Sequence, residues 1–283
     1  MMKCLVINLD RSSERLAHVT AEFGRLGIAF ERVAAVDARL RPDLAQIPLR
    51  VPRSLGWRLT DSEIACLMSH RRCWEIVAQG NDPYCAIFED DVVLSDGAER
   101  LLRDAGWIPA DADVVKLETF LKKTVVGQRC NLPVDGFSLS RLHSVHLGTA
   151  GYIVSRQAAR DLLGETVDIG IPVDHIVFNP IFSVPAGRRI YQMVPALCLQ
   201  DQFLGERAVG LPSLLRQERL DQWLAGSGKS KPGKSLKKRV TTEIRRLVDQ
   251  LRHALRLRQT RIIPFDYRGQ RVRPHIQHRE NAL

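Results

Sequence analysis

Hydrophobic and polar positions alternate between strand and helix patterns along the first part of the chain. Residues 3–9 form an apolar run with β-branched members, which is typical of a buried strand. A helical repeat comes next and ends at Gly27, and residues 29–37 predict a second strand. The apolar positions of this repeat are Leu16, Val19, Phe23 and Leu26. A strand–helix–strand unit of this kind predicts a parallel sheet with a right-handed crossover.

The same alternation continues as far as Asp201. Residues 59–80 predict a helix that begins with a capping box, because Thr60 and Glu63 have the T-x-x-E spacing. Residues 84–94 predict the next strand. Further strand patterns cover residues 112–119, 146–155 and 188–201, and helical patterns cover residues 95–106 and 156–164. The chain therefore predicts an α/β fold with a mostly parallel central sheet, in one domain over residues 1–225.

The charge of the chain is uneven, although its composition is that of a globular protein. Hydrophobic residues make up 45% and charged residues 26% of the chain, and the formal net charge is +10. Between Lys229 and Arg258, 11 lysines and arginines stand against two acids, Glu243 and Asp249. Most of the excess charge is therefore local, which indicates one binding site for an anionic partner.

Residues 226–283 predict a flexible linker and a basic amphipathic helical tail. The Gly/Ser/Pro/Lys stretch around Pro232 is typical of a linker. Apolar residues then recur at helical spacing through residues 236–258. Residues 229–258 either lie on an anionic membrane surface or pack their apolar stripe on the main domain. Nucleic acid is disfavoured as a partner, because no aromatic residues interleave the basic ones and no DNA-binding module is visible.

The cysteines and the hydrophobicity favour a cytoplasmic protein. None of the six cysteines forms a C-x-x-C pair, and most have apolar neighbours, as buried thiols do. No apolar run approaches the ~20 residues that span a bilayer, and the first residues lack the pattern of an export signal.

Three acids, Glu89, Asp90 and Asp91, follow the apolar part of the strand predicted over residues 84–94. Ligands of open α/β sheets bind beyond the carboxyl ends of the strands. A divalent cation relieves the repulsion between adjacent carboxylates and can bridge phosphate oxygens. In extended chain Glu89 and Asp91 point the same way, so they are the pair expected to share an ion. The alternative is a solvated turn that caps the following helix.

Motifs in a fixed order give the chain a family resemblance. VINLDRSSERL (residues 6–16) is similar to I-N-L-x-R-x-x-x-R, and residues 59–77 with AIFEDDVVL are similar to a G-E-x-x-C-x-x-S-H-x-x-x-W helix followed by L-E-D-D. Residues 148–163 and IPVDHIVFN supply the remaining signatures. The chain thus resembles glycosyltransferase family 25, the lipopolysaccharide and lipo-oligosaccharide biosynthesis glycosyltransferases, which are related to collagen galactosyltransferases. Ser62 departs from the usual glycine, and the tail after Gly226 lies outside the match.

The resemblance implies a GT-A type nucleotide-sugar-binding fold and a UDP-sugar donor, often UDP-galactose. It also implies a divalent cation, Mn²⁺ or Mg²⁺, and inversion at the anomeric carbon. The expected activity is transfer of a hexose, galactose, to a saccharide or lipid-linked saccharide in lipopolysaccharide or lipo-oligosaccharide synthesis. The basic tail would hold such an enzyme peripherally at the inner face of the inner membrane.

An inverting transfer needs groups that stabilise the leaving UDP and a base that takes the proton of the acceptor hydroxyl. Glu89, Asp90 and Asp91 are the expected cation ligands, and Gln200 and Asp201 are candidates to complete the shell. Asp174 is the expected base that takes the proton of the acceptor hydroxyl, with a plain helix cap as the alternative. His175 is a second candidate, as a base or as a cation ligand.

The expected donor-binding residues surround these acids. They are Asn8, Arg11, Arg15, Asp37, Glu63, His70, Gly148, Thr149 and Tyr152. Arginines suit phosphate, and an acid after the second strand suits a ribose hydroxyl. The capping box also accounts for Glu63, and a core hydrogen bond also accounts for His70. Cys66, His70 and Cys73 share a helical face, but the sequence shows no further ligand cluster and does not predict zinc.

Two other functions fit parts of the pattern. A nucleotidyltransferase or phosphohydrolase would use the same acids on the same cation but would consume a nucleoside triphosphate. A non-catalytic membrane or nucleic-acid adaptor would act through the basic tail alone. A substrate panel distinguishes the first alternative from a glycosyltransferase, because only the first consumes a nucleoside triphosphate. Removal of residues 227–283 distinguishes the second, because an adaptor would then lose all its activity.

Overall fold

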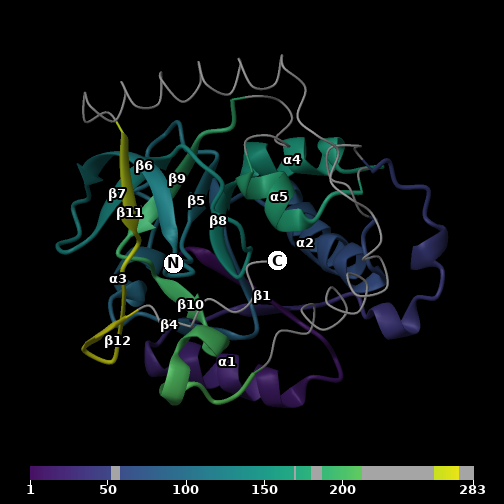
Figure 1. The fold of residues 1–283 in the computed structure, drawn as a ribbon, viewed down its shortest axis with the longest axis horizontal. Helices are drawn as coiled ribbons and strands as arrows, with labels where there is room; N and C mark the ends of the chain where they lie inside the picture. Colours follow the sequence, from purple (N-terminus) through teal and green to yellow (C-terminus); the bar gives the residue numbers. More distant parts are fainter. Residues whose placement is uncertain (52–57, 169, 180–186, 212–257, 274–283) are drawn as a thin grey trace, which may run out of the picture.

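The computed structural model describes residues 1–51, 58–168, 170–179, 187–211 and 258–273. Within them a mixed nine-stranded sheet forms the centre of the molecule, in the order β11-β6-β7-β9-β5-β8-β3-β1-β2 (Figure 1). Its strands are β1 (Lys3–Asn8), β2 (Glu31–Ala34), β3 (Tyr84–Glu89), β5 (Val114–Lys116), β6 (Lys123–Asn131), β7 (Ser138–Leu142), β8 (Gly151–Ser155), β9 (Ile190–Val194) and β11 (Arg258–Ile262). The α/β class predicted from the sequence is confirmed.

The sheet is mixed rather than mostly parallel. β1 lies parallel to both β2 and β3, as the strand–helix–strand pattern predicts, and β5 lies parallel to β9. The other pairings between described strands are antiparallel, and β8 runs antiparallel to both of its neighbours, β3 and β5. Parallel pairing is therefore concentrated at the β2 end, where the chain begins.

Helices cover both faces of this sheet. The α-helices are α1 (Ser13–Arg25), α2 (Asp61–Gln79), α3 (Ala98–Leu102), α4 (Arg156–Glu165) and α5 (Val173–Phe178). In β1, Leu5 and Ile7 pack in one core with residues of α2, α4 and α5, while Cys4 and Val6 pack in a second core with residues of α1 and α3. The two cores follow from the alternation of side chains along a strand. Figure 1 shows α2, α4 and α5 grouped together and α1 apart from them.

Helix α2 begins as the capping-box spacing predicts. The Thr60 hydroxyl accepts from the Glu63 backbone N–H at 3.1 Å, and the Glu63 carboxylate accepts from the Thr60 N–H at 2.9 Å. Two N–H groups that the helix leaves without partners are thereby satisfied. This explains Glu63 as the residue that fixes the start of the helix.

The strand pattern over residues 84–94 is divided into two strands. The chain turns at Asp90 and Asp91 and leaves the central sheet, and β4 (Val92–Leu94) pairs with β10 (Cys198–Gln200) in a small antiparallel sheet. Four short 3-10 turns are also described: η1 (Ala38–Leu40), η2 (Leu44–Gln46), η3 (Asp201–Phe203) and η4 (Gly205–Arg207). None of the described helices is long and apolar enough to cross a membrane.

Residues 258–273 form strands, although they belong to the segment for which the sequence predicts a helical tail. β11 pairs with β6, and β12 (Phe265–Tyr267) forms a hairpin with β13 (Gln270–Val272). Ile263 and Phe265 are fully buried, and the Tyr267 hydroxyl donates to Glu22 at 2.9 Å. The alternating apolar positions bury one side of this segment against the domain. The linker and helix predicted over residues 226–257 lie outside the described residues.

Candidate functional site

The candidate site lies at the carboxyl ends of β1 and β3. These strands are parallel neighbours, with Ile7 opposite Glu89, so Asn8 and the three acids emerge at the same edge of the sheet. A cavity of about 220 Å³ lies there. Glu89, Asp90 and Asp91 line it together with Gln200. The predicted donor-binding residues that line it are Arg11, Arg15, Asp37 and His70.

Asp90 and Asp91 are held by cationic and amide groups of the first strand and helix. Asn8 Nδ2 donates to Asp90 Oδ2 at 2.7 Å, and Arg15 Nε donates to Asp90 Oδ1 at 2.6 Å. The other end of the Arg15 guanidinium lies 2.9 Å from Asp91 Oδ2. One arginine thus bridges two adjacent carboxylates, and together with Asn8 they bring four predicted site residues into one network.

Asp91 keeps a proton more readily than an ordinary aspartate. Its carboxyl is buried, and burial raises its pKa to about 7, while Arg15 opposes this rise and the charges of Glu89 and Asp90 add to it. Gln200 Nε2 also lies 3.2 Å from Asp91 Oδ2. The charge of Arg15 does not offset the burial of Asp91, and a buried carboxyl group with too little positive charge around it favours the binding of a cation.

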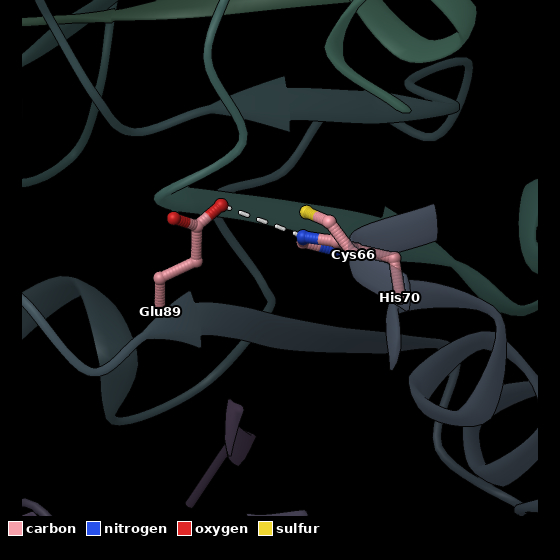
Figure 2. Close-up of side chains that lie close together, drawn as sticks. All are labelled: Cys66, His70 and Glu89. Atoms are coloured by element: carbon pink, nitrogen blue, oxygen red, sulfur yellow. Dashed lines mark ion pairs between the residues drawn. The ribbon is translucent and has the colours of Figure 1, made fainter. Parts of the chain in front are cut away.

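Glu89 contacts a different set of groups from its two neighbours. Its Oε1 accepts from the Thr149 hydroxyl at 2.9 Å and lies 3.5 Å from His70 Nε2. Burial disfavours ionisation of Glu89, but the contacts with His70 and Thr149 and the charge of Arg15 outweigh it and lower the pKa of Glu89. Figure 2 shows Glu89 facing His70 and Cys66 of α2. The expectation that Glu89 and Asp91 share one ion stays a prediction.

His70 belongs to a buried chain of polar groups. Its side chain is inaccessible to solvent, and its Nδ1 lies 3.0 Å from the hydroxyl of Tyr152. The same hydroxyl accepts from the indole N–H of Trp74 at 2.8 Å. Tyr152, predicted to bind the donor, is fully buried and does not line the cavity described above. It instead fixes the ring of His70.

Gly148 lies over a buried ion pair. Its φ of +89° is in the left-handed region, and a Cβ on it would lie 2.2 Å from Phe120 Cζ, so glycine is required there. Its carbonyl accepts from Lys116 Nζ at 2.6 Å, and that ammonium lies 3.2 Å from Glu118 Oε2. Both Lys116 and Glu118 are fully buried, and burial raises the pKa of Glu118 to about 7 against the opposing charge of Lys116. This pair was not predicted from the sequence.

Asp174 lies beside Gly148 rather than among the cavity residues. Its Oδ2 is 3.4 Å from the Gly148 backbone N–H, and its Oδ1 accepts from the N–H of His175 at 2.9 Å. The His175 ring is placed by Asn179, whose Nδ2 lies 2.9 Å from Nδ1. The two predicted base candidates thus lie at the start of α5, and Gly148 and Thr149 connect them to Glu89.

The carboxylate of Asp201 holds a loop. Its Oδ1 accepts from the backbone N–H of Val209 at 2.9 Å, and its Oδ2 accepts from those of Gly210 and Leu211 at 3.0 Å. Both oxygens are therefore engaged with the backbone, and the side chain is fully buried. Of the two candidates to complete a cation shell, Gln200 lines the cavity and Asp201 does not.

Arg11 and Asp37 form a pair between the cavity and a second hollow. Arg11 Nε donates to Asp37 Oδ2 at 2.6 Å, and both residues line the two hollows. Burial works to raise the pKa of Asp37, but the hydrogen bonds from Arg11 and the Arg39 backbone outweigh it and lower that pKa. Arg39, Arg41 and Arg72 also line the second hollow. These arginines were not predicted from the sequence, in which the signal for them is the position of Arg39 and Arg41 after β2 and of Arg72 on α2.

Comparisons with known proteins show the family of the chain. A family model described as glycosyltransferase family 25 (LPS biosynthesis protein) matches residues 1–177. The chain is 36% identical over 227 residues to the lacto-N-neotetraose biosynthesis glycosyltransferase LgtE of Neisseria gonorrhoeae, covering 76% of this chain and 80% of that protein.

Two further relatives extend the similarity. LgtB of Neisseria meningitidis serogroup B, also named as a lacto-N-neotetraose biosynthesis glycosyltransferase, is 31% identical over 272 residues, which cover 92% of this chain and 98% of that protein. The lipooligosaccharide biosynthesis protein lic2B of Haemophilus influenzae is 31% identical over 226 residues, which cover 76% of this chain and 82% of that protein. The match to LgtB takes in nearly the whole of both chains.

Proposed function

Because the chain belongs to glycosyltransferase family 25 and is a glycosyltransferase of lipopolysaccharide synthesis, we propose that it transfers a hexose from a UDP-sugar to a saccharide acceptor with inversion. The hexose is galactose, and the acceptor is a growing lipopolysaccharide or lipo-oligosaccharide glycan. The observation that carries the proposal is the cavity at the ends of β1 and β3, where arginines and three acids face the same space.

The arginines of the cavity support a diphosphate-bearing donor. Arg11 and Arg15 line the cavity, and guanidinium groups bind phosphate oxygens through paired N–H donors. Asp37 lies at the same wall and suits a ribose hydroxyl. The donor would therefore lie over the end of β1, with its sugar towards Thr149.

The oxygen ligands that the three acids offer suit Mn²⁺ or Mg²⁺. The carboxylate oxygens of Glu89, Asp90 and Asp91 are hard ligands of the kind these ions prefer, and the side-chain amide of Gln200 lies beside them. Burial raises the pKa of Asp91 even though Arg15 opposes the rise, so this buried acid has little positive charge around it. When bound, such an ion neutralises charge on the leaving diphosphate. Arg15 would share that task from the side of α1.

Asp174 is our proposed base, and His175 is the second candidate. Asp174 Oδ2 faces the Gly148 N–H, and the next residue, Thr149, touches Glu89, so an acceptor hydroxyl beside Gly148 would meet both the base and the donor sugar. In the proposed step the hydroxyl oxygen attacks the anomeric carbon as its proton passes to the Asp174 carboxylate. The bond from that carbon to the diphosphate oxygen breaks, and UDP leaves.

A substrate panel tests the proposal with the full chain. UDP-galactose, UDP-glucose, GDP-mannose and ATP are each offered with soluble oligosaccharide acceptors, with Mn²⁺ or with a chelator. We expect UDP release and a product heavier by one hexose with UDP-galactose and Mn²⁺, and a β-linked product by nuclear magnetic resonance. Turnover of ATP without hexose transfer would instead indicate the nucleotidyltransferase or phosphohydrolase alternative.

Asp91→Asn is the matched variant for this assay, and Asp161→Asn is its control. Asp91 is buried in the network, whereas Asp161 is on α4 and pairs with Gln157 at the surface. We expect Asp91→Asn to lower transfer on the order of 100-fold or more and Asp161→Asn to leave it unchanged. Full activity in Asp91→Asn would rule out the acids as the centre of the reaction.

We also propose that the enzyme works on the cytoplasmic side of the inner membrane. The support is the concentration of positive charge in residues 229–258, which suits an anionic lipid surface. Co-sedimentation with vesicles of anionic phospholipid is expected at low salt and lost at high salt. Equal binding to zwitterionic vesicles would contradict an electrostatic attachment.

A further inference from the structure

Three side chains of different chemistry converge on one wall of the cavity. Cys66 and His70 are four residues apart on α2, a spacing that places both on the same face of a helix. Glu89 reaches them from the end of β3 (Figure 2). One ligand atom from each, sulfur, nitrogen and oxygen, lies within 4.8 Å of the other two.

His70 Nε2 is the atom that points to a ligand. The ring is fully buried, and Nε2 has no hydrogen-bond partner within the described residues, which is costly for a buried polar atom. Its distance of 3.5 Å to Glu89 Oε1 is long for a hydrogen bond. It is close to the ~3.3 Å that separates two ligand atoms bound at 2.0–2.1 Å to one tetrahedral zinc ion.

Neighbouring hydrogen bonds fix the orientation of His70 and Glu89, as hydrogen bonds to metal ligands do in known metal sites. The hydroxyl of Tyr152 lies 3.0 Å from His70 Nδ1 and is itself fixed by Trp74. With Nδ1 protonated and donating to that hydroxyl, the lone pair of Nε2 faces Cys66 and Glu89. Thr149 holds Glu89 from the other side. The three candidate ligands are therefore close enough together to converge on one ion.

We propose that Cys66, His70 and Glu89 form a zinc site, which shares Glu89 but no other ligand with the Mn²⁺ or Mg²⁺ site of the proposed transferase. Zinc was not expected from the sequence because no further ligand cluster is visible there beside Cys66, His70 and Cys73, whereas the fold brings Glu89 to Cys66 and His70. All three residues line the cavity, so the fourth position opens into it and takes a water or an anionic oxygen. Binding deprotonates the Cys66 thiol, and that proton passes to solvent.

The ligand types select the metal. Thiolate and imidazole favour zinc and its analogues cobalt and cadmium, while Mg²⁺ and Mn²⁺ prefer carboxylate and carbonyl oxygen. Glu89 is common to this site and to the set of acids in the proposed function, so zinc bound here would withdraw Glu89 from the proposed manganese site. The zinc site rests on the Cys66–His70–Glu89 geometry alone and stands whether or not the donor and cation of the reaction are as proposed.

Cobalt spectroscopy on the metal-free full chain tests the site. One equivalent of Co²⁺ is expected to give the thiolate-to-cobalt charge-transfer band and the visible bands of a tetrahedral ion, and one equivalent of Zn²⁺ is expected to abolish both. Cys66→Ser should remove the charge-transfer band and weaken zinc binding, measured against a chromophoric chelator, on the order of 100-fold or more. His70→Asn should weaken zinc binding to a similar extent.

The controls separate this site from other thiols and from loss of the fold. Cys130→Ser removes an exposed thiol and Cys73→Ala removes a buried thiol of the same helix, and both should keep the band. A thermal transition like that of the wild type shows that Cys66→Ser is folded. A band that persists in folded Cys66→Ser, or one that never forms in the wild type, would overturn the proposal. Because the assay contains no donor or acceptor, neither result bears on hexose transfer.

Discussion

Arg15 lies 2.9 Å from Asp91, and so a residue of the first helix supplies the positive charge beside the site acid whose pKa burial raises. The same guanidinium donates to Asp90. The side chains of Arg15 and Asp91 are both largely inaccessible to solvent, and salt screens a buried ion pair only a little. The state of the acids therefore depends on this arginine.

Replacing Arg15 by methionine should make transfer more sensitive to acid. Without the guanidinium, the pKa of Asp91 rises further above about 7, so more of the carboxyl is protonated at neutral pH. We expect the loss of activity to be larger at pH 6.5 than at pH 8.5, and on the order of tenfold at pH 7. Initial rates across this range give the profile. Arg15→Lys should recover part of the activity, and Arg189→Met, at an exposed arginine, should match the wild type.

His146 should make the fold less stable in mild acid. Burial, with the nearby charge of Lys116, lowers the pKa of this imidazole to about 3, and its Nδ1 lies 2.8 Å from Gln192 Oε1. The unfolded chain takes up a proton near pH 6.5 that the folded protein does not, so stability is lost as pH falls below about 6.5. This group alone should cost ~1.4 kcal/mol of unfolding free energy between pH 7.5 and pH 5.5.

Urea unfolding of His146→Asn at both pH values checks the expectation for His146. The variant should lose less stability than the wild type on acidification, by roughly the same 1.4 kcal/mol. An equal loss in the two proteins would mean that the imidazole is protonated in the folded state.

The Lys116–Glu118 pair should show strong coupling. Glu118→Gln keeps an acceptor for the Ala150 N–H but leaves a buried ammonium without its counter-charge, which should cost about 3–5 kcal/mol. Adding Lys116→Met removes that ammonium, so the double variant should be more stable than Glu118→Gln alone. Denaturant unfolding of the wild type, Glu118→Gln, Lys116→Met and the double variant gives the coupling energy between the two side chains. Additive effects of the two substitutions on the unfolding free energy would contradict a direct ionic interaction.

Phe265 should be essential to the stability of the domain. Its side chain is fully buried in the core that also contains residues of α2 and β1, so Phe265→Ala should cost about 3–5 kcal/mol. Ile262, nearby in β11, is 39% exposed and provides the control, with an expected cost within about 0.5 kcal/mol for Ile262→Ala. Thermal and denaturant unfolding compare the two. A stable Phe265→Ala would mean that residues 258–273 are not part of the folded domain.

Local signals in the sequence predict the elements near the site well. The capping box at Thr60 and Glu63 marks the start of α2, and the apolar run before Glu89 marks β3, because both depend on neighbouring residues only. The direction of β8 depends instead on pairing with β3 and β5, which are far away along the chain. Pairing of that kind leaves no trace in local spacing, and this is why the sheet was expected to be mostly parallel.

The contacts within the site also depend on residues far apart in the chain, so the sequence predicts them only in part. The sequence identifies the acids at the end of β3, but not that Glu89 faces His70 while Asp91 faces Arg15. Asp201 at the tip of β10 resembles a ligand in the sequence, yet backbone groups eight to ten residues later take up both of its oxygens. For the segment after Arg258, the alternation of Ile263, Phe265 and Tyr267 was a usable strand signal, obscured by the basic helical pattern before it.

The position of β11 beside β6 has a consequence for biosynthesis. Residues 258–262 leave the ribosome well after residues 123–131, so for much of translation the backbone N–H and C=O groups on that side of β6 have no partner strand. A nascent chain in that state offers a template on which another unfinished copy can pair. Early stop codons before this segment should therefore yield aggregated protein rather than a shortened soluble enzyme.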